Sequence, residues 1–515
     1  MFSTLSLIAS FLHLGVHGQA PKPHLIFILQ DDLGRFDTAI YGNKAAEAAT
    51  HNITSLAREG VVLSNHYVHW HCSPTRRSFL TGRLPLHHTE KLSGLDTDDI
   101  DLRWAWISEK LRAAGYVSHW YGKGHTGYRS MNHLPARRGF NGGSLLFFTG
   151  AGSYTTLPRW SGEGPVDTKQ EYSTDLFGSL AVRAVRDHDP AVPLFLYLPF
   201  QAVHTPYDLP PDRTGAECPS NIACMLQDAD RWVGELVLAL KEKGMYENTL
   251  IVYSSDNGGV TDGNNYPLRG EKHTNWQGAM RVAAFVSGGY VPKAVRGTTN
   301  DGVFHVVDWY PTFAGLAGVD GSDDPPVPPL PVDPQHPDRD IYQGGLSYPP
   351  VDGKDIWPQV ASGSSTTPHP CLWLSAEVLL KGKYKLLVAQ PSPELMFSQF
   401  VNNGWKLPNG TWVDAPDGLW PCNAYQRRSH FVPCLFDVDA DPREEHNLAA
   451  EMPELVSAMW AELNRTSLTA YSARSPERLL GICHPLCALG KWGGTPGPVC
   501  GVPGCEWDTE GEVVV

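Results

Sequence analysis

The chain has no excess of positive charge and, after its first 20 residues, no apolar run of bilayer length. Its 515 residues contain 41 Lys and Arg against 55 Asp and Glu, a formal net charge of −14. No basic stripe is present that could neutralise phosphates, so nucleic acid is not expected as a partner. An anionic substrate would have to be attracted by local cations. A membrane-spanning helix needs about 20 consecutive apolar residues, so no membrane span is predicted.

Two other patterns are also missing from the chain. It has no internal repeat, which argues against a solenoid, and no Cys/His cluster with the spacing of a zinc site. Any bound metal would therefore rely on oxygen ligands. Hydrophobic residues make up 42% of the chain and include 16 Trp, enough for a large packed core. The length suggests roughly two to three domains.

Residues 1–20 have the composition of a secretory signal peptide. The stretch 2–16 is uncharged and rich in Leu, Ile and Phe, and it is too short to span a bilayer comfortably. Its n-region has no Lys or Arg, which is unusual for a signal peptide. We expect entry into the secretory pathway, with a secreted (extracellular) or lysosomal destination left open.

Ten cysteines in a secreted chain predict disulfides, with an odd thiol left over once Cys72 is set aside. If cysteines that are close in the sequence pair with each other, the expected disulfides are Cys218 with Cys224, Cys422 with Cys434, and two among Cys483, Cys487, Cys500 and Cys505. Cys371 would then be unpaired.

Three Asn-x-Ser/Thr motifs occur, at Asn52, Asn409 and Asn464. Asn409 and Asn464 are candidate glycosylation sites. Asn52 is instead a candidate N-cap for the helix expected through residues 56 and 57.

Four short apolar runs, each ending in polar residues, predict an α/β fold. Continuous apolarity is typical of strands buried on both faces of a largely parallel sheet, and residues 222–243 between two of the runs have helical spacing. Open α/β sheets place their sites at the carboxyl ends of such strands. The runs are residues 24–29 before Asp31 and Asp32, 116–121 before Lys123 and His125, 194–198 before His204, and 250–253 before Asp256 and Asn257.

The chain is predicted to contain a large and a small domain. Residues 21–365 form the expected catalytic domain, which ends in a Pro-rich surface connection over residues 323–350. Strand-like residues 384–388 and 434–438 and a helix near 455–463 indicate a smaller α+β domain over 366–470. The Cys-rich tail, residues 471–515, is expected to wrap the surface.

Asp31, Asp32, Asp256 and Asn257 offer four oxygen-donor side chains at two strand ends. Hard divalent ions prefer such ligands, and Ca²⁺ tolerates irregular mixtures of carboxylate and amide, so calcium is predicted, with magnesium as second choice. The alternative is structural: the two Asp residues would cap the next helix, and Asp256-Asn257 would form a turn.

The most informative motif is Cys72-Ser73-Pro74-Thr75-Arg76, followed by Gly82. A plain interpretation is a cysteine in a turn, fixed by Pro74 and followed by a helix that buries Phe79 and Leu80. The motif alone is short enough to match many proteins by chance, so the rest of the chain has to decide.

The ordered set of motifs resembles the type I, formylglycine-dependent sulfatases over about residues 24–463. The layout is nearest to arylsulfatase B and its relatives, which act on sulfated sugars. The resemblance implies an alkaline-phosphatase-like fold, in which helices sandwich a large, mixed, mostly parallel sheet. The matching patterns are Asp31-Asp32, Cys72-x-Pro-x-Arg76, Gly122-Lys123-Gly124-His125, His204-Thr205-Pro206, Ser255-Asp256-Asn257-Gly258, Leu268-Arg269-Gly270-Glu271-Lys272, Leu435-Phe436-Asp437, Asp441-Pro442-Arg443-Glu444 and Asn447-Leu448.

The resemblance also implies roles for particular residues. Cys72 would be oxidised to 3-oxoalanine (formylglycine) by the formylglycine-generating enzyme during secretion, and would then act as nucleophile and metal ligand beside Asp31, Asp32, Asp256 and Asn257. Arg76 would hold the aldehyde hydrate, and Lys123 and Lys272 would clamp the sulfate oxygens. His125 would be the base for sulfate release, while His204, with Lys272, would assist the leaving oxygen.

Three departures from the family pattern bear on the substrate. Gly124 stands where Trp is common, which predicts a more open pocket wall. Gln277 and Ala279 replace Glu and Gly, and Arg77 replaces a small residue. An aryl sulfate and a sulfated glycan therefore both remain candidate substrates.

Two other functions remain as alternatives. A phosphatase or phosphodiesterase of the same superfamily would generally use Ser or Thr as nucleophile and often two metals. A catalytically silent, carbohydrate-binding relative would be expected to lack Cys72, Arg76 or the Asp pairs, and all of these are present.

Overall fold

The computed structural model describes most of the expected catalytic region and parts of the C-terminal region. The described residues are 21–323 except 89, 91–98, 149, 151, 163, 169 and 217, together with 348–391, 402–414, 422, 433–471, 485–493, 497, 498, 502 and 505. The predicted signal peptide, most of the Pro-rich connection and much of the Cys-rich tail lie outside them.

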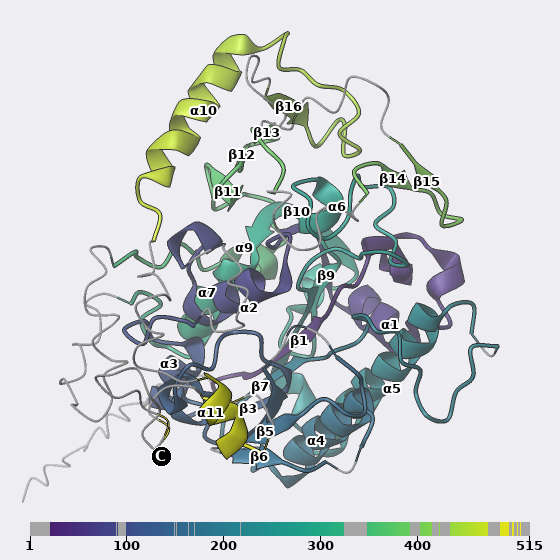
Figure 1. Cartoon of the computed structure of the whole chain (residues 1–515), viewed down its shortest axis with the longest axis vertical. Coiled ribbons are helices and arrows are strands. Elements are labelled where there is room, and N and C mark those ends of the chain that lie inside the picture. Colours follow the sequence, from purple (N-terminus) through teal and green to yellow (C-terminus); the bar gives the residue numbers. More distant parts are fainter. Residues whose placement is uncertain are drawn as a thin grey trace, which may run out of the picture.

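A ten-stranded mixed sheet forms the centre of the molecule, in the order β10-β2-β9-β8-β1-β7-β3-β4-β5-β6 (Figure 1). Its central strands β8, β1, β7 and β3 pair in parallel, while β9, β5 and β6 run antiparallel to their neighbours. The strands are β1 His24–Gln30, β2 Val61–Tyr67, β3 Val117–Lys123, β4 Gly143–Phe147, β5 Arg159–Ser161, β6 Gly164–Val166, β7 Leu194–Pro199, β8 Thr249–Ser255, β9 Ala284–Ser287 and β10 Thr298–His305.

Helices cover both faces of this sheet because its central strands are apolar on both sides. Every residue of β1 is buried: Leu25, Phe27 and Leu29 pack on one face, and Ile26 and Ile28 on the other. The first face is covered by α2 Cys72–Thr81, α3 Ile107–Ala113, α7 Trp309–Leu316 and α9 Trp357–Ser362; the second by α1 His51–Glu59, α4 Ser173–Asp187 and α5 Asn221–Glu242 (Figure 1). The predicted α/β sandwich is confirmed.

A small antiparallel sheet follows in the C-terminal region, at the opposite end of the molecule from α4 and α5 (Figure 1). Apolar residues of α10 pack on its strands β12, β13 and β16, as the predicted strands and helix require. The elements are β11 Leu372–Ser375, β12 Val378–Lys381, β13 Tyr384–Leu387, β16 Cys434–Asp437 and α10 Pro453–Ser467, with the hairpin β14 Trp405–Lys406 and β15 Trp412–Val413; α6 Gln277–Met280 and α11 Pro485–Lys491 complete the α-helices of the described residues.

The described residues contain the disulfides Cys218–Cys224, Cys422–Cys434 and Cys487–Cys505. The first two were predicted, and the third is one of the pairings left open for the tail. Cys371 is free, as expected. Cys483 and Cys500 lie outside the described residues.

The predicted role of Asn52 is wrong. Thr50 occupies the N-cap position of α1, and Asn52 lies in the first turn. The Asn52 side chain donates to Asp230 Oδ2 at 2.9 Å, so it joins α1 to α5. Asn409 and Asn464 are both exposed, as a glycosylation site requires, and their modification stays a prediction. Among the described helices, none has the length and apolarity needed to cross a membrane.

Removing the Phe79 side chain should loosen α2 from the sheet. Phe79 is fully buried, and its ring stacks on Phe27 with centroids 4.0 Å apart. We expect Phe79→Ala to lower the free energy of unfolding by about 3–5 kcal/mol, because the site cannot fill the cavity. Leu238→Ala on α5 is the control, since Leu238 is 46% exposed. Denaturant unfolding that shows equal, small effects for both variants would contradict this packing.

Candidate active site

Four neighbouring parallel strands bring their carboxyl ends to one edge of the sheet. The order β8-β1-β7-β3 places the residues after β1 between those that follow β8 and β7. Asp31 and Asp32 follow β1, Asp256 and Asn257 follow β8, and Lys123 ends β3. The register pairs Gln30 with Ser255, so the residues after them meet. The predicted convergence of strand ends is therefore present.

Helix α2 carries the motif cysteine to this edge. Cys72 is the first residue of α2 and is only 1% exposed. Thr75 Oγ1 accepts a hydrogen bond from His69 N at 3.0 Å, which fixes the turn before the helix. Lys123 Nζ lies 3.5 Å from Cys72 Sγ and 2.5 Å from Asp31 Oδ2. Lys123 thus contacts both the Cys72 thiol and the Asp31 carboxylate.

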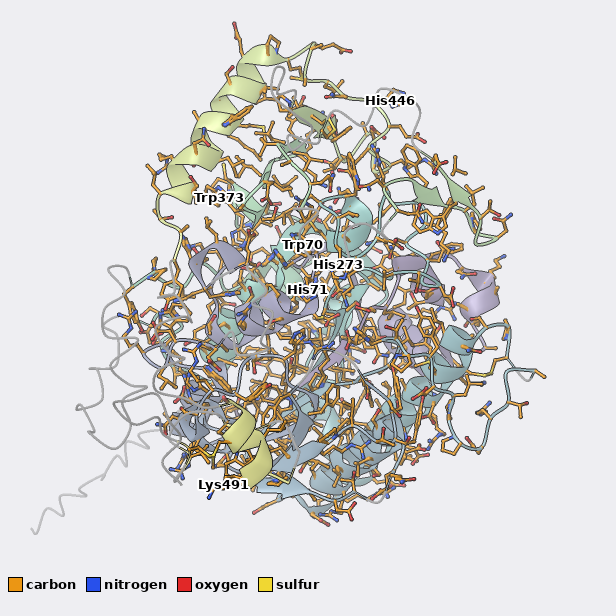
Figure 2. The ribbon with its side chains drawn as sticks, in the orientation of Figure 1. Trp70, His71, His273, Trp373, His446 and Lys491 are labelled. Carbon is orange, nitrogen blue, oxygen red and sulfur yellow. A yellow bond between two sulfur atoms is a disulfide. The ribbon has the colours of Figure 1, made fainter. Side chains whose placement is uncertain are left out.

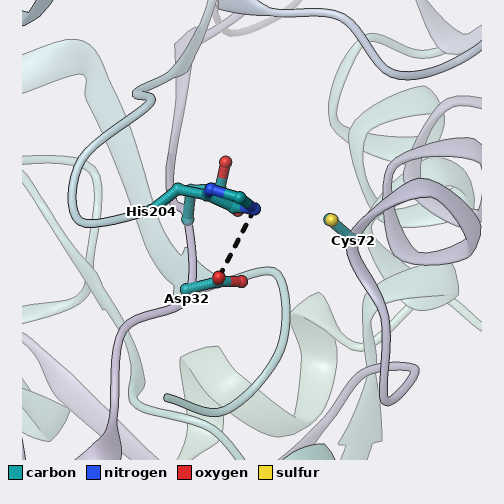
Figure 3. Close-up of side chains that lie close together, drawn as sticks. Asp32, Cys72 and His204 are labelled. Atoms are coloured by element: carbon teal, nitrogen blue, oxygen red, sulfur yellow. Dashed lines mark ion pairs between the residues drawn. The ribbon is translucent and has the colours of Figure 1, made fainter. Parts of the chain in front are cut away.

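Each of the three buried carboxylates has a cationic partner. Besides the pair of Asp31 and Lys123, Arg76 donates through Nε and Nη2 to Asp256 Oδ2 at 2.9 and 2.7 Å. Lys272 Nζ donates to Asp32 Oδ1 at 2.6 Å. His204 Nε2 lies 3.5 Å from Asp32 Oδ2, opposite Cys72 (Figure 3). Buried charges are tolerated only when they are paired in this way.

Burial and crowding of like charges perturb the pKa values of this group. Burial raises the pKa of Asp31 and of Asp256, and repulsion from Asp256 raises that of Asp31 further. Burial acts in the same direction on Asp32, but Lys272 and His204 outweigh it and hold the pKa of Asp32 well below its usual range. Burial thus favours the neutral forms of Asp31 and Asp256, whereas Asp32 stays ionised.

The Cys72 thiol is shifted in the opposite direction. Burial opposes its ionisation, but His71, Lys123 and Lys272 outweigh it and bring the pKa of Cys72 well below the ordinary value. Burial lowers the pKa of His71 to about 4, so His71 itself is neutral near neutral pH. The local field favours an anion at position 72.

A divalent cation fits part of the predicted ligand set; Asp256 is outside the group of ligand atoms that meet, because its Oδ2 is bound to Arg76, and His204 joins that group instead. Asp31 Oδ1 and Asn257 Oδ1 are buried and have no hydrogen-bond partner among the described residues. Asp31, Asp32, Cys72 and His204 each offer a ligand atom, all within 4.8 Å of one another. Asn257 Nδ2 donates to Asp32 Oδ1 at 2.8 Å, which leaves its oxygen for another partner. A hard cation would satisfy these buried acceptors.

Two site residues adopt backbone conformations that non-glycine residues rarely adopt. Asp32 has φ of 57° and His125 has φ of 53°, both in the left-handed region. Such strain persists where the surrounding structure holds it, often at functional sites.

Sequence reasoning missed three aromatic residues near Cys72. Trp70, His71 and His273 lie together in the middle of the molecule (Figure 2). The ring of His71 is 5.0 Å from that of His273 and 5.7 Å from that of His125. The two histidines could have been found from their positions in the sequence, because His71 precedes Cys72 and His273 follows Lys272.

The sequence predicted a more open pocket wall at Gly124, but the structure has no free space at the position of a Cβ on this residue. A Cβ at Gly124 would lie 2.9 Å from Phe147 O and 3.0 Å from Leu146 Cδ1. The end of β4 therefore occupies the space that the family's Trp side chain would enter first.

A sequence profile described as Sulfatase matches residues 23–319. The chain belongs to the sulfatase family. Arylsulfatase J of Mus musculus is 32% identical over 89% of this chain and 78% of its own length. N-acetylgalactosamine-6-sulfatase of Canis lupus familiaris is 28% identical over 88% of this chain and 87% of its own.

A solved structure agrees with this assignment at the level of fold. The PsFucS1 sulfatase from Pseudoalteromonas sp. has a TM-score of 0.65 and 23% identity, covering 88% of this chain and 92% of its own. The predicted resemblance to type I sulfatases is confirmed, and the protein is a sulfatase, an enzyme that hydrolyses sulfate esters.

Cation binding should depend on Asp31. We expect calcium at about 100 times its Kd to stabilise the chelator-treated protein by about 2.7 kcal/mol, with a smaller effect of magnesium. Asp31→Asn should lose this stabilisation, measured as the calcium-dependent rise in melting temperature. The control is Asp230→Asn, a buried carboxylate that accepts from Ile53 N at 2.8 Å, and it should keep the rise. An unchanged rise in Asp31→Asn would refute the ligand assignment.

Proposed function

We propose that this sulfatase cleaves sulfate monoesters of phenols or carbohydrates with a formylglycine made from Cys72 and a bound Ca²⁺. The observation that carries the proposal is the place of Cys72, whose sulfur lies 3.5 Å from Lys123 Nζ and within 4.8 Å of carboxylate oxygens of Asp31 and Asp32. A thiol sulfur is a poor calcium ligand, whereas an aldehyde hydrate presents oxygens. With that modification, the motif cysteine and the carboxylates make one site.

The modified residue and the cation would supply chemistry that the unmodified side chains lack. A hydrated formylglycine offers one hydroxyl that could attack sulfur and a second whose deprotonation could expel sulfate. A bound Ca²⁺ would withdraw charge from the oxygens it binds. Its ligands would be Asp31, Asp32, Asp256, Asn257 and residue 72.

Two lysines of the site would bind the sulfate group. Lys123 and Lys272 are buried within reach of Asp31 and Asp32, so they are held in place before the substrate arrives. Burial opposes the charge on Lys272 and on Arg76, but the surrounding carboxylates outweigh it and raise the pKa of both. Arg76 donates to Asp256 and to Lys123 O, and its positive charge would help to hold the hydrate at position 72.

His125 is suited to accept a proton from residue 72. Burial lowers the pKa of His125 to about 4, so the imidazole is neutral at higher pH. It can therefore act as the base that deprotonates the hydroxyl and releases sulfate.

His204 is suited to donate to the leaving oxygen only when it is doubly protonated. Its Nδ1 lies 2.5 Å from Thr205 O, and a carbonyl oxygen only accepts, so Nδ1 carries a proton. Donation from Nε2 therefore needs the second proton, although burial lowers the pKa of His204 to about 3. The negative charge of a bound sulfate ester would raise that pKa, which couples proton donation to substrate binding.

The second candidate, a two-metal phosphatase or phosphodiesterase, has less support. Within the described residues, the other cluster of carboxylates and histidine that could hold a metal is Asp441, Glu445 and His446, and it is not buried. The catalytically silent alternative is disfavoured because Cys72, Arg76 and both Asp pairs lie together in the site.

The relatives support a substrate range that includes glycans. One relative is named for an arylsulfate substrate and one for sulfated N-acetylgalactosamine. We propose secretion, or delivery to a lysosome, after modification by the formylglycine-generating enzyme. A desulfation screen over sulfated glycans and aryl sulfates would identify the substrate.

The modification can be read directly from one tryptic peptide. No Lys or Arg lies between Glu59 and Arg76, so trypsin should release residues 59–76 intact. In protein from a host that makes formylglycine, this peptide should carry –CHO in place of –CH2SH at Cys72 and resist thiol alkylation. Cys72→Ser should keep the fold but lose multiple turnover. Active enzyme with an alkylatable Cys72 would overturn the proposed mechanism.

A further inference from the structure

Lys272 lies in a loop, not in a helix or strand. We call residues 269–277 the Lys272 loop; it follows β8 and ends at Gln277, the first residue of α6. Loops are generally more mobile than the elements they connect. Nevertheless, Lys272 Nζ reaches Asp32 Oδ1 at 2.6 Å in a buried site. Something outside the loop must hold it in place.

One side of the Lys272 loop is bound by residues 402–405 of the C-terminal region. Asn402 N donates to Glu271 Oε1 at 2.8 Å, and Gly270 N donates to Gly404 O at 2.8 Å. Trp276 Nε1 donates to Asn403 Oδ1 at 2.9 Å. These bonds tie both the start and the end of the loop to one short segment.

Arg269 reinforces the same contact. Its guanidinium lies 3.6 Å from the ring centre of Trp276 and 4.9 Å from that of Trp405. It also donates to Asn403 O at 2.7 Å and to Glu444 O at 3.1 Å. The side chain is 1% exposed, so this cation–π arrangement is desolvated.

The other side of the loop is bound by a buried ion pair of the small sheet. Lys385 Nζ and Glu444 Oε1 lie 2.7 Å apart, and both side chains are fully buried. Lys385 Nζ also donates to Asn275 O at 2.7 Å, and Glu444 Oε2 accepts from Gln277 N at 2.7 Å. The pair therefore uses its remaining hydrogen-bonding capacity on the backbone of the Lys272 loop.

Between these anchored ends, the loop turns toward Cys72. Lys272 extends to Asp32, and His273, with φ of 71°, donates its backbone N–H to Trp70 O at 3.1 Å. Glu444 has φ of 54°, so a left-handed residue occurs on each side of the contact. The loop is strained where it enters the site and held where it meets the C-terminal region.

We propose that the C-terminal region is a clamp that positions Lys272 for sulfate ester hydrolysis, with Lys385 and Glu444 as positioning residues. The clamp comprises Lys385, Gln390, residues 402–405 and Glu444. The proposal rests on the proposed role of Lys272 as a sulfate ligand. A charge that stabilises a transition state is effective only in the right place, and a displacement of about 1 Å can cost about a hundredfold in rate.

The test variant is Glu444→Gln. It keeps an acceptor for Gln277 N but removes the charge opposite Lys385. We expect kcat for a sulfate ester to fall by about 10- to 100-fold, mainly without a change in KM, while the protein stays folded. The matched control is Asp323→Asn, which breaks the buried pair of Arg83 and Asp323 (3.0 Å); within the described residues this pair makes no hydrogen bond to the Lys272 loop. Its kcat should stay near that of the parent enzyme.

A double variant separates positioning from a general loss of stability. If the clamp acts through Lys272, Lys272→Ala with Glu444→Gln should be no slower than Lys272→Ala alone, because the effects of a coupled pair are not additive. Independent, multiplying losses would overturn the clamp. If Lys272→Ala is slow and Glu444→Gln is not, the clamp fails and the role of Lys272 stands. If Lys272→Ala is fully active, the role of Lys272 fails and the clamp fails with it.

A second variant covers the case in which Glu444→Gln does not fold. Gln390 Oε1 accepts from Asn275 N at 2.8 Å, and Gln390→Met removes this bond while leaving the ion pair intact. It should lower kcat several-fold while the protein stays folded, and show no further effect in the Lys272→Ala background. An unchanged kcat would contradict the proposal.

Discussion

The structure depends on the pairing of three buried carboxylates with three buried cations. Asp31, Asp32 and Asp256 lie at the ends of two adjacent strands, where burial opposes their ionisation and keeps the pKa of Asp31 and Asp256 raised even beside the cations. Lys123, Lys272 and Arg76 offset that cost only because each lies within hydrogen-bond distance of its partner. The pairing requires strand ends, a helix and a loop to meet at one edge of the sheet.

The three cations come from three different parts of the fold. Lys123 is the last residue of β3, and Arg76 lies on α2, whose Phe79 packs against the sheet; both are positioned by the large domain itself. Lys272 lies on a loop bound by segments from the C-terminal region. The small antiparallel sheet is therefore more than an addition at one end of the molecule (Figure 1), since its buried Lys385–Glu444 pair contacts the loop that completes the site.

Much of the site could be predicted from local sequence patterns. Apolar runs followed by Asp, Asn, Lys or His marked the strand ends, because a buried parallel strand and its polar terminus are both encoded within about ten residues. Contacts between distant segments were not predictable in this way. Lys385 and Glu444 read as ordinary charged residues, and only packing shows that they meet Asn275 and Gln277. Asn52 likewise looked like a cap until its partner on α5, Asp230, was known.

The most direct test of the account compares a sulfate and a phosphate monoester of the same phenol with one preparation of the metal-loaded enzyme. The leaving group is then constant, so the ratio of kcat/KM values reports only how well the site stabilises the transferred group. The account predicts a ratio in favour of the sulfate ester that disappears in Cys72→Ser. Faster hydrolysis of the phosphate ester, with Cys72→Ser still turning over, would contradict it.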